Sequence, residues 1–173
     1  LLVAPASLPI LPIESLSAYL DQFKFLYHPP QEFNISYSEY PINLALRIGW
    51  EELVRKVADV YNELPPEDRQ VAGIYANWYA PASAIDYFGP QYGLPHAVSG
   101  HLAYYLWGPG YSWDVMIMLM HDSTVMSLLY DRCEMKGRVF NPYTLPLNQL
   151  TIYVCRKPRL PPDEIWPHLQ MYQ

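Results

Sequence analysis

The stretch VAGIYANWYAPASAIDYF, Val71 to Phe88, decides the fold. Its first six residues, Val71 to Ala76, are small, β-branched or aromatic, as is typical of a buried strand. The loop 77–79 follows, and Pro81 suits the first turn of a helix because proline has no N–H to lose there. The stretch therefore predicts a strand, a loop and a helix in succession, which is the repeating unit of layered α/β folds.

The same alternation is expected on both sides of this stretch. Upstream, the apolar residues from Trp50 to Leu64 fall at helical spacing on one face, and LPPEDR, residues 64–69, ends that helix. Downstream we expect, in order, a short strand at 96–100, a short helix at 101–107, a buried strand at 114–120, a helix at 124–132 capped by Asp122 and Ser123, strands at 133–140 and 150–156, and a final helical turn stopped by Pro167. The pattern predicts an α/β layered sandwich whose largely parallel or mixed sheet is flanked by helices.

Domain boundaries follow from the apolar start of the chain. Residues 1–13 are apolar but contain Pro5, Pro9 and Pro12, and no basic residue precedes them as in a signal peptide. We expect residues 1–13 to be either the trailing end of a membrane helix or an apolar arm. We expect residues 14–173 to form a single soluble α/β domain. Within it, residues 14–23 favour a short helix and residues 28–43 an irregular aromatic loop.

Composition and charge restrict the possible partners. The chain is 51% hydrophobic and 16% charged, with a net charge of −6 and no basic stripe, which argues against a nucleic-acid partner. Cys133 and Cys155 are too few for a zinc ribbon and too far apart for a CxxC pair. A disulfide in an exported domain and two buried thiols on neighbouring strands both remain open.

Two loops are candidates for ligand binding, because ligands of α/β sheets lie beyond the carboxyl ends of strands. They are the loop 77–79 and the turn 99–101. Aromatic rings there could stack on the faces of sugars, while Asn, Asp, His and Tyr could bind hydroxyl groups. The simpler interpretation of both loops is a structural turn.

Catalytic signals are weaker. Asp86, His96 and His101 are the candidates for general acid or base chemistry. The simpler roles are capping or a bond to a neighbouring loop for Asp86, and packing and hydrogen bonding for His101. Their spacing does not fit a metal triad. The glycines of WGPGYSW, residues 107–113, lack the Lys-Ser/Thr of a phosphate loop, and no G-x-S-x-G elbow is present. We therefore expect no catalytic residue, no metal site and no cofactor in this domain.

The run GIYANWYAPASAIDYFGPQYGLPHAVSGHLAYYLWGPG, residues 73–110, resembles a segment near the C-terminus of bacterial polytopic membrane glycosyltransferases. In this dolichyl-phosphate-mannose mannosyltransferase-like, aminoarabinose-transferase-like superfamily the segment reads NYG-x-A-x-A-I-D-F-F-G…GLP…SGH-x-x-Y-x-L-W-G. The likeness covers Gly49 to Tyr172. The chain departs from the family at Trp78-Tyr79-Ala80-Pro81, in place of Tyr-Gly, and at Leu102, in place of Asn.

The resemblance implies a parent enzyme that transfers a sugar from a polyprenyl-phosphate donor, with this domain on the periplasmic, extracytoplasmic side. The domain itself would be non-catalytic, would bind an acceptor glycan or cover the membrane active site, and would have the membrane portion of the same polypeptide as its partner. The expected ligand-binding residues are Asn77, Trp78, Tyr79, Asp86, Ser99, His101, Tyr104 and Trp107. A free-standing hydrolase using Asp86 with His96 or His101, and a purely structural docking domain, are the alternatives.

Overall fold

The computed structural model describes residues 10–22, 45–145 and 148–172. The chain divides into two compact units, one made of residues 1–49 with 141–149 and the other of residues 50–140 with 150–173. The sequence instead predicts a boundary after residue 13 and a single domain over residues 14–173. The apolar segment 1–9 and the expected loop at 28–43 lie outside the described residues.

The smaller unit contains α2, Ile13–Gln22. Leu16 and Leu20, one helical turn apart, pack with Ala45 and Leu145 in a small apolar cluster. The hydroxyl of Thr144 donates to the carbonyl oxygen of Ala45 over 2.9 Å, so segments distant in sequence are joined there. Within residues 10–22, 45–145 and 148–172, no helix is long and apolar enough to cross a membrane.

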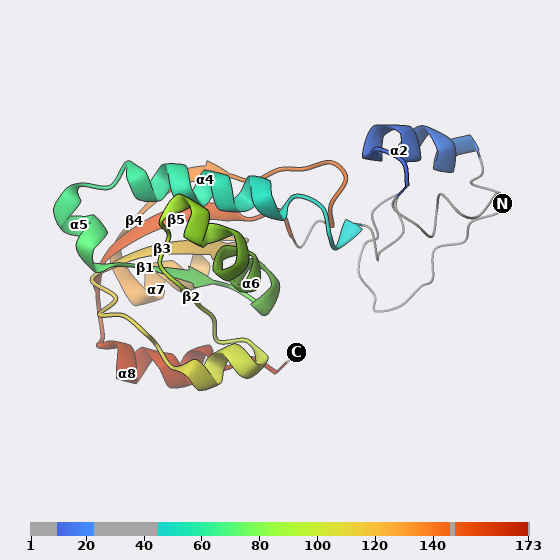
Figure 1. Ribbon diagram of the computed structural model, residues 1–173. Coiled ribbons are helices and arrows are strands. Elements are labelled where there is room, and N and C mark those ends of the chain that lie inside the picture. The colour runs from blue at the N-terminus through green and yellow to red at the C-terminus, as the bar shows by residue number, and fades with distance from the viewer. Residues whose placement is uncertain (1–9, 23–44, 146–147, 173) are drawn as a thin grey trace. The chain divides into compact units, whose positions relative to one another are not determined.

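The larger unit is built on a five-stranded mixed sheet of order β2-β1-β3-β5-β4 (Figure 1). Strands β1, β2 and β3 are parallel to one another, whereas β5 is antiparallel to both β3 and β4. The strands are β1 (Ala72–Ala76), β2 (Ala97–Val98), β3 (Val115–Met120), β4 (Tyr130–Arg138) and β5 (Thr151–Pro158). The expected α/β layered fold with a mixed sheet is therefore confirmed.

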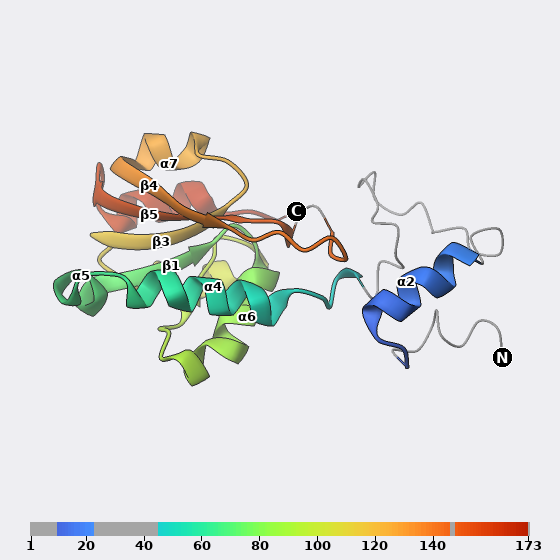
Figure 2. The same ribbon diagram turned by 90° about the horizontal axis from the view of Figure 1, so that it is seen from above.

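Helices cover both faces of this sheet, as Figure 2 shows. One face carries α4 and α6, and the other carries α7, α8 and the turn that follows it. The helices are α4 (Trp50–Asn62), α5 (Pro66–Val71), α6 (Tyr79–Phe88), α7 (Thr124–Leu129) and α8 (Pro162–Ile165), and the 3₁₀ helices are η2 (Gly89–Tyr92), η3 (Leu102–Trp107) and η5 (Trp166–Leu169).

Strand β3 shows why the sheet needs two covers. Val115, Ile117 and Leu119 belong to the core under α4 and α6. Met116 and Met118 alternate with them and belong to the core under α7 and α8. Side chains of a strand point alternately to opposite faces, so a continuous apolar run must be buried on both.

Several expected boundaries were wrong. Val71, expected to begin the first strand, is the last residue of α5. LPPEDR was expected only to end a helix, but its second proline, Pro66, also begins α5. Proline suits that position because the N–H groups of a helix's first turn have no partner within the helix. Pro167 does not stop the last helix, because it occupies an early position of η5. The helix expected at 124–132 ends at Leu129, where the chain enters β4.

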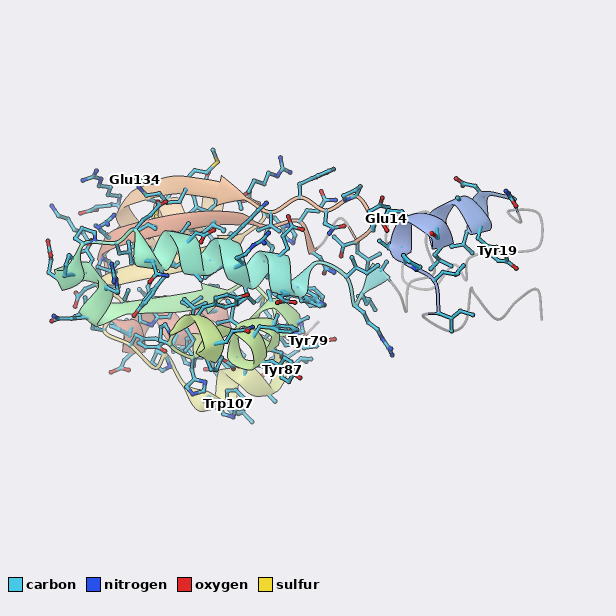
Figure 3. The ribbon with its side chains drawn as sticks, turned by 45° about the horizontal axis from the view of Figure 1, so that its top comes forward. Glu14, Tyr19, Tyr79, Tyr87, Trp107 and Glu134 are labelled. Carbon is cyan, nitrogen blue, oxygen red and sulfur yellow. A yellow bond between two sulfur atoms is a disulfide. The ribbon has the colours of Figure 1, made fainter. Side chains whose placement is uncertain are left out.

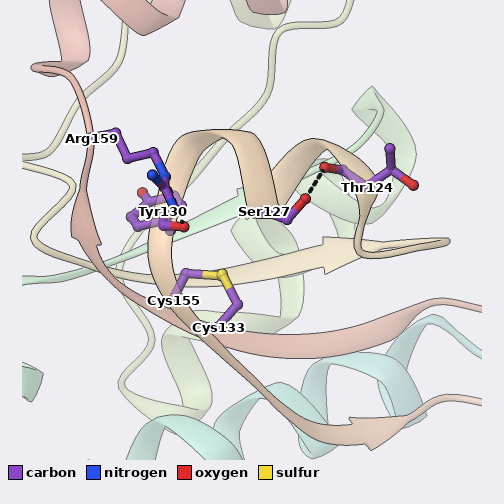
Figure 4. Close-up of a disulfide and its surroundings, with 6 residues drawn as sticks. All are labelled: Thr124, Ser127, Tyr130, Cys133, Cys155 and Arg159. Carbon is purple, nitrogen blue, oxygen red and sulfur yellow. Dashed lines mark hydrogen bonds between the residues drawn. A yellow bond between two sulfur atoms is a disulfide. The ribbon is translucent and has the colours of Figure 1, made fainter.

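Cys133 and Cys155 form a disulfide (Figure 4). They face each other in the antiparallel register of β4 and β5, which is how two cysteines far apart in sequence come within bonding reach. Cys155 is fully buried, beside the core residue Tyr130. The bond fastens β4, which lies at the edge of the sheet, to its only neighbouring strand.

We expect reduction of this disulfide to lower the free energy of unfolding by roughly 3 kcal/mol, because it closes a loop between cysteines 22 positions apart. Urea unfolding with and without dithiothreitol measures the difference. The Cys133→Ser/Cys155→Ser variant should show the reduced midpoint under both conditions. Equal midpoints for the wild type with and without reductant would contradict a stabilising disulfide.

Candidate functional site

The two predicted ligand loops lie at the same edge of the sheet. Strands β1 and β2 are parallel neighbours, with Tyr75 opposite Val98, so the residues that follow each strand emerge side by side. Asn77 and Trp78 follow β1, with Tyr79 as the first residue of α6, and the turn 99–101 follows β2. The expectation that both loops lie at the carboxyl ends of parallel strands is confirmed.

Four aromatic rings from these loops and from α4 form a continuous group, which we call the rim cluster. Its members are Trp50, Trp78, Tyr79 and His101. The Tyr79 ring stacks on His101 with centroids 5.3 Å apart and meets the edge of Trp78 at 5.3 Å. Trp78 in turn lies 6.3 Å from Trp50. Tyr79 is the most exposed member at 44%, and Trp50 and Trp78 are partly exposed (Figure 3).

The rim cluster contains two buried nitrogen atoms without hydrogen bonds. Nε1 of Trp78 and Nδ1 of His101 have no partner among the described residues. A buried polar group left unpaired costs about 1–3 kcal/mol, so such atoms mark places where water or a ligand group belongs. Both side chains contact the half-exposed Tyr79 ring. The two nitrogens therefore lie on either side of one solvent-exposed ring.

Asp86 joins three elements through its carboxylate. One oxygen accepts a hydrogen bond from the backbone N–H of Ala97 in β2 at 2.8 Å. The other accepts from the hydroxyl of Tyr104 in η3 at 2.9 Å. We call this arrangement of Asp86, Ala97 and Tyr104 the Asp86 clasp. It gives Asp86 and Tyr104 positioning roles, which agrees with the simpler interpretation of Asp86.

The clasp continues along one face of α6. Tyr79, Ser83 and Asp86 are spaced by one helical turn each, and the hydroxyl of Tyr104 also lies 3.3 Å from that of Ser83. The Ser83 hydroxyl itself donates to the carbonyl oxygen of Tyr79. Burial is the main cause that raises the pKa of Tyr104, and the Asp86 carboxylate raises it further. Tyr104 is thus held as a neutral donor.

Ser99 and Gly100 are structural. Ser99 is fully buried, and its hydroxyl accepts from the N–H of His101 at 3.3 Å. A side chain at Gly100 would collide with the carbonyl oxygen of Leu169. The C-terminal segment lies against this turn, with Met171 N–H donating to Gly100 O at 2.8 Å and Leu102 N–H donating to Met171 O at 2.9 Å. Only glycine fits this crossing.

Leu102 has a left-handed backbone conformation with φ of 51°. Asn tolerates that region better than a branched side chain does.

Trp107 lies outside the rim cluster. Its ring contacts Tyr104 at a centroid distance of 4.5 Å, and the residue is 68% exposed. Asn77 follows β1 directly, and its backbone N–H donates to Leu119 O in β3 at 3.1 Å. The predicted ligand residues are thus divided among the rim cluster, the Asp86 clasp and an exposed ring, while Asn77 and Ser99 belong to none of these groups.

The hydrolase alternative requires Asp86 to lie close to His96 or to His101, and the structure brings only His96 close to it. Nδ1 of His96 lies 3.4 Å from Asp86, but the His96 side chain is 86% exposed. No hydrogen bond or ion pair connects His101 with Asp86, both of which belong to the described part. In the part of the chain that the structure describes, no group of three or more His, Cys, Asp or Glu side chains could hold a metal ion.

Some residues at the site were not found from the sequence. Ser83 could have been found from its helical spacing between Tyr79 and Asp86. Trp50 was assigned to the core face of its helix, and nothing in the sequence signals that it also meets Trp78. The crossing of Leu169 and Met171 over Gly100 joins segments about 70 residues apart and leaves no local pattern.

A separate groove of about 390 Å³ lies between the end of α4, α5 and strands β4 and β5. Its charges neutralise one another: Arg156 binds Asp68 at 2.7 Å, and Glu134 pairs with both Arg132 and Lys136. These two cations lower the pKa of Glu134. Because its cations already have acidic partners, the groove has little charge left to attract an ion.

No protein-family model, curated protein or solved structure matches this chain.

Gly100→Ala should lower the free energy of unfolding by roughly 2–3 kcal/mol, because the new methyl group displaces the Leu169 backbone. Urea unfolding measures this loss. Gly137→Ala is the matched control, since nothing lies within 4 Å of a Cβ at that position. Its effect should stay within about 0.5 kcal/mol. Equal losses for the two variants would show that the crossing does not constrain Gly100.

His101 should make stability depend on pH. Burial lowers the pKa of His101 from its ordinary value of 6.5 in the folded state. The unfolded chain therefore takes up the proton first, and the stability present above about pH 6.5 is lost as the pH falls towards the folded-state pKa. His101→Phe keeps a ring against Tyr79 and should remove this dependence. Urea midpoints of both proteins from about pH 7.5 to about pH 5 test it, and parallel profiles would contradict it.

Proposed function

We propose that this chain is the extracytoplasmic C-terminal part of a membrane glycosyltransferase that uses a polyprenyl-phosphate sugar donor. In this proposal the domain is non-catalytic by itself. Its rim cluster engages the acceptor glycan or covers the active site that the membrane portion of the same polypeptide supplies.

The observation that carries this proposal is the way the motif residues interlock. Asp86 belongs to the first part of the glycosyltransferase-like motif and Tyr104 to the last, and the Asp86 clasp joins them. Gly93 and Gly108, which also match the motif, have left-handed φ values of 71° and 80°. A chance similarity between two sequences would not be expected to involve residues that bind one another in the folded chain. The motif therefore behaves as a structural unit, which supports the family assignment.

The rim cluster supports glycan binding within that assignment. It offers a half-exposed ring and two polar nitrogens without partners among the described residues, in Trp78 and His101. Sugars present apolar C–H faces and hydroxyl groups, and aromatic walls with a few polar atoms are suited to both. The Cys133–Cys155 disulfide supports the proposed extracytoplasmic location, because such bonds persist mainly in oxidising environments outside the cytosol.

A hydrolase using Asp86 and His96 is the second candidate, and their 3.4 Å separation is what favours it. The clasp weighs against it, because both Asp86 oxygens already accept hydrogen bonds that hold β2 and η3. A general base that must gain and lose a proton would disturb those contacts. The hydrolase candidate predicts that His96→Gln abolishes a hydrolytic activity, whereas the transferase proposal predicts no effect of that change on sugar transfer.

The test uses membranes from cells that carry the complete gene and membranes from cells that lack it. Both are incubated with a panel of polyprenyl-phosphate-linked labelled sugars, and label transferred to glycan or lipid acceptors is counted. Transfer that depends on the gene is expected for at least one donor. Absence of transfer for the whole panel would overturn the assignment.

The rim cluster is tested with Trp78→Phe/His101→Phe, which keeps two rings and removes both unpartnered nitrogens. Loss of two hydrogen bonds of about 1 kcal/mol each should raise the acceptor KM about tenfold or more. A fall in kcat at unchanged KM would indicate the covering role instead. Tyr172→Phe, at an exposed position, is the control and should change neither constant. Wild-type KM and kcat in the double variant would remove the rim cluster from the function.

A further inference from the structure

Helix η3 is held on two sides and leaves its end projecting. Tyr104 is bound by the Asp86 clasp. Tyr105 stacks on Trp166 with nearly parallel rings 5.4 Å apart, and its carbonyl oxygen accepts from Nε1 of Trp166 at 3.2 Å. The next two residues, Leu106 and Trp107, are 79% and 68% exposed. The contacts of Tyr104 and Tyr105 therefore hold η3 in a position from which the side chains of Leu106 and Trp107 point into solvent.

Helix α6 also carries an exposed aromatic side chain. Tyr87 follows Asp86 in α6 and is 80% exposed. Tyr104 donates a hydrogen bond to Asp86, the residue before Tyr87, and its ring contacts Trp107, so both exposed rings lie next in sequence to, or in contact with, members of the Asp86 clasp. Figure 3 shows both side chains at the same border of the larger unit. We call Tyr87, Leu106 and Trp107 the aromatic tip.

The sequence around the tip carries no positive charge. No Lys or Arg occurs between Arg69 and Arg132. The acid next to the tip, Asp86, is occupied by the clasp. The stretch that carries the tip therefore offers no Lys or Arg to an anionic partner such as a phosphate group or an acidic peptide, and its exposed side chains supply apolar and aromatic contacts.

From these observations we propose that the aromatic tip inserts into the interfacial region of a lipid bilayer. Tyr and Trp have an apolar ring with a polar end, which suits the boundary between acyl chains and headgroups, and Leu106 supplies a purely apolar contact. Sugars and other small ligands bind in concave sites that enclose most of their surface. Side chains that protrude with more than two-thirds of their surface exposed do not form such a site, and this favours a lipid surface over a glycan at the tip.

This inference moves Trp107 from the ligand-binding group to a membrane contact. It does not depend on the glycosyltransferase proposal, because bilayer binding is measured on the purified chain without donor, acceptor or transfer. Failure of the vesicle experiment would leave the transfer experiment unaffected, and the reverse also holds.

The experiment measures co-sedimentation of the purified chain with phosphatidylcholine vesicles. We expect binding that is unchanged between about 0.05 and 0.5 M NaCl, since salt screens only charged contacts. Leu106→Ser/Trp107→Ser should lower the partition coefficient about tenfold or more, through loss of buried apolar surface. Brominated acyl chains should quench tryptophan fluorescence in the wild type, and Trp107→Phe should remove most of that quenching.

Leu128→Ser/Met135→Ser is the matched control. These side chains are 71% and 69% exposed on α7 and β4, away from the tip, and their loss should change the partition coefficient less than about twofold. The apolar residues 1–13 are present in every variant, so the comparison reports the tip alone. Binding that is absent, requires anionic lipid, or is equal in the two double variants would overturn the proposal. The proposal would also be overturned if Leu106→Ser/Trp107→Ser reduced self-association of the chain and left vesicle binding unchanged. The tip would then contact a second copy of the chain instead of a bilayer.

Discussion

The carboxylate of Asp86 is the group on which the arrangement of this edge of the sheet depends. It receives a backbone N–H from β2 and a hydroxyl from η3 while belonging to α6. Hydrogen bonds to a charged acceptor are stronger than neutral ones, at about 1.5–3 kcal/mol each, so one half-buried side chain fixes three elements relative to one another. Strand β2 has only two residues, and the sheet alone would hold it weakly.

Two different surfaces follow from that constraint. On the strand side, the clasp and the crossing of the C-terminal segment over Gly100 position His101 against Tyr79 and so complete the rim cluster. On the solvent side, the same clasp holds Tyr104 and makes the following Leu106 and Trp107 project. The proposed glycan contact and the proposed lipid contact are therefore separate, although both depend on Asp86. A domain that binds a glycan close to a bilayer would need such a division.

Local patterns predicted most of the elements. The helix from Trp50 and the buried strands of the sheet could be recognised because their periodicity and apolar runs are continuous. The boundaries at Pro66 and Pro167 were missed, since proline both ends and begins helical turns. The site was predictable as an edge of the sheet but not as a set of contacts. The pairing of Asp86 with Tyr104 and of Gly100 with Leu169 depends on how distant segments pack, and a single sequence does not record that.

The central claim is that Asp86 and Tyr104 hold this edge together as a coupled pair. A double-mutant cycle of Asp86→Ala and Tyr104→Phe, measured by urea unfolding, isolates their interaction because the loss of the Ala97 hydrogen bond cancels between its two arms. We predict a coupling free energy of about 1.5–3 kcal/mol. A coupling below about 0.3 kcal/mol, with the two single losses simply adding, would contradict the clasp.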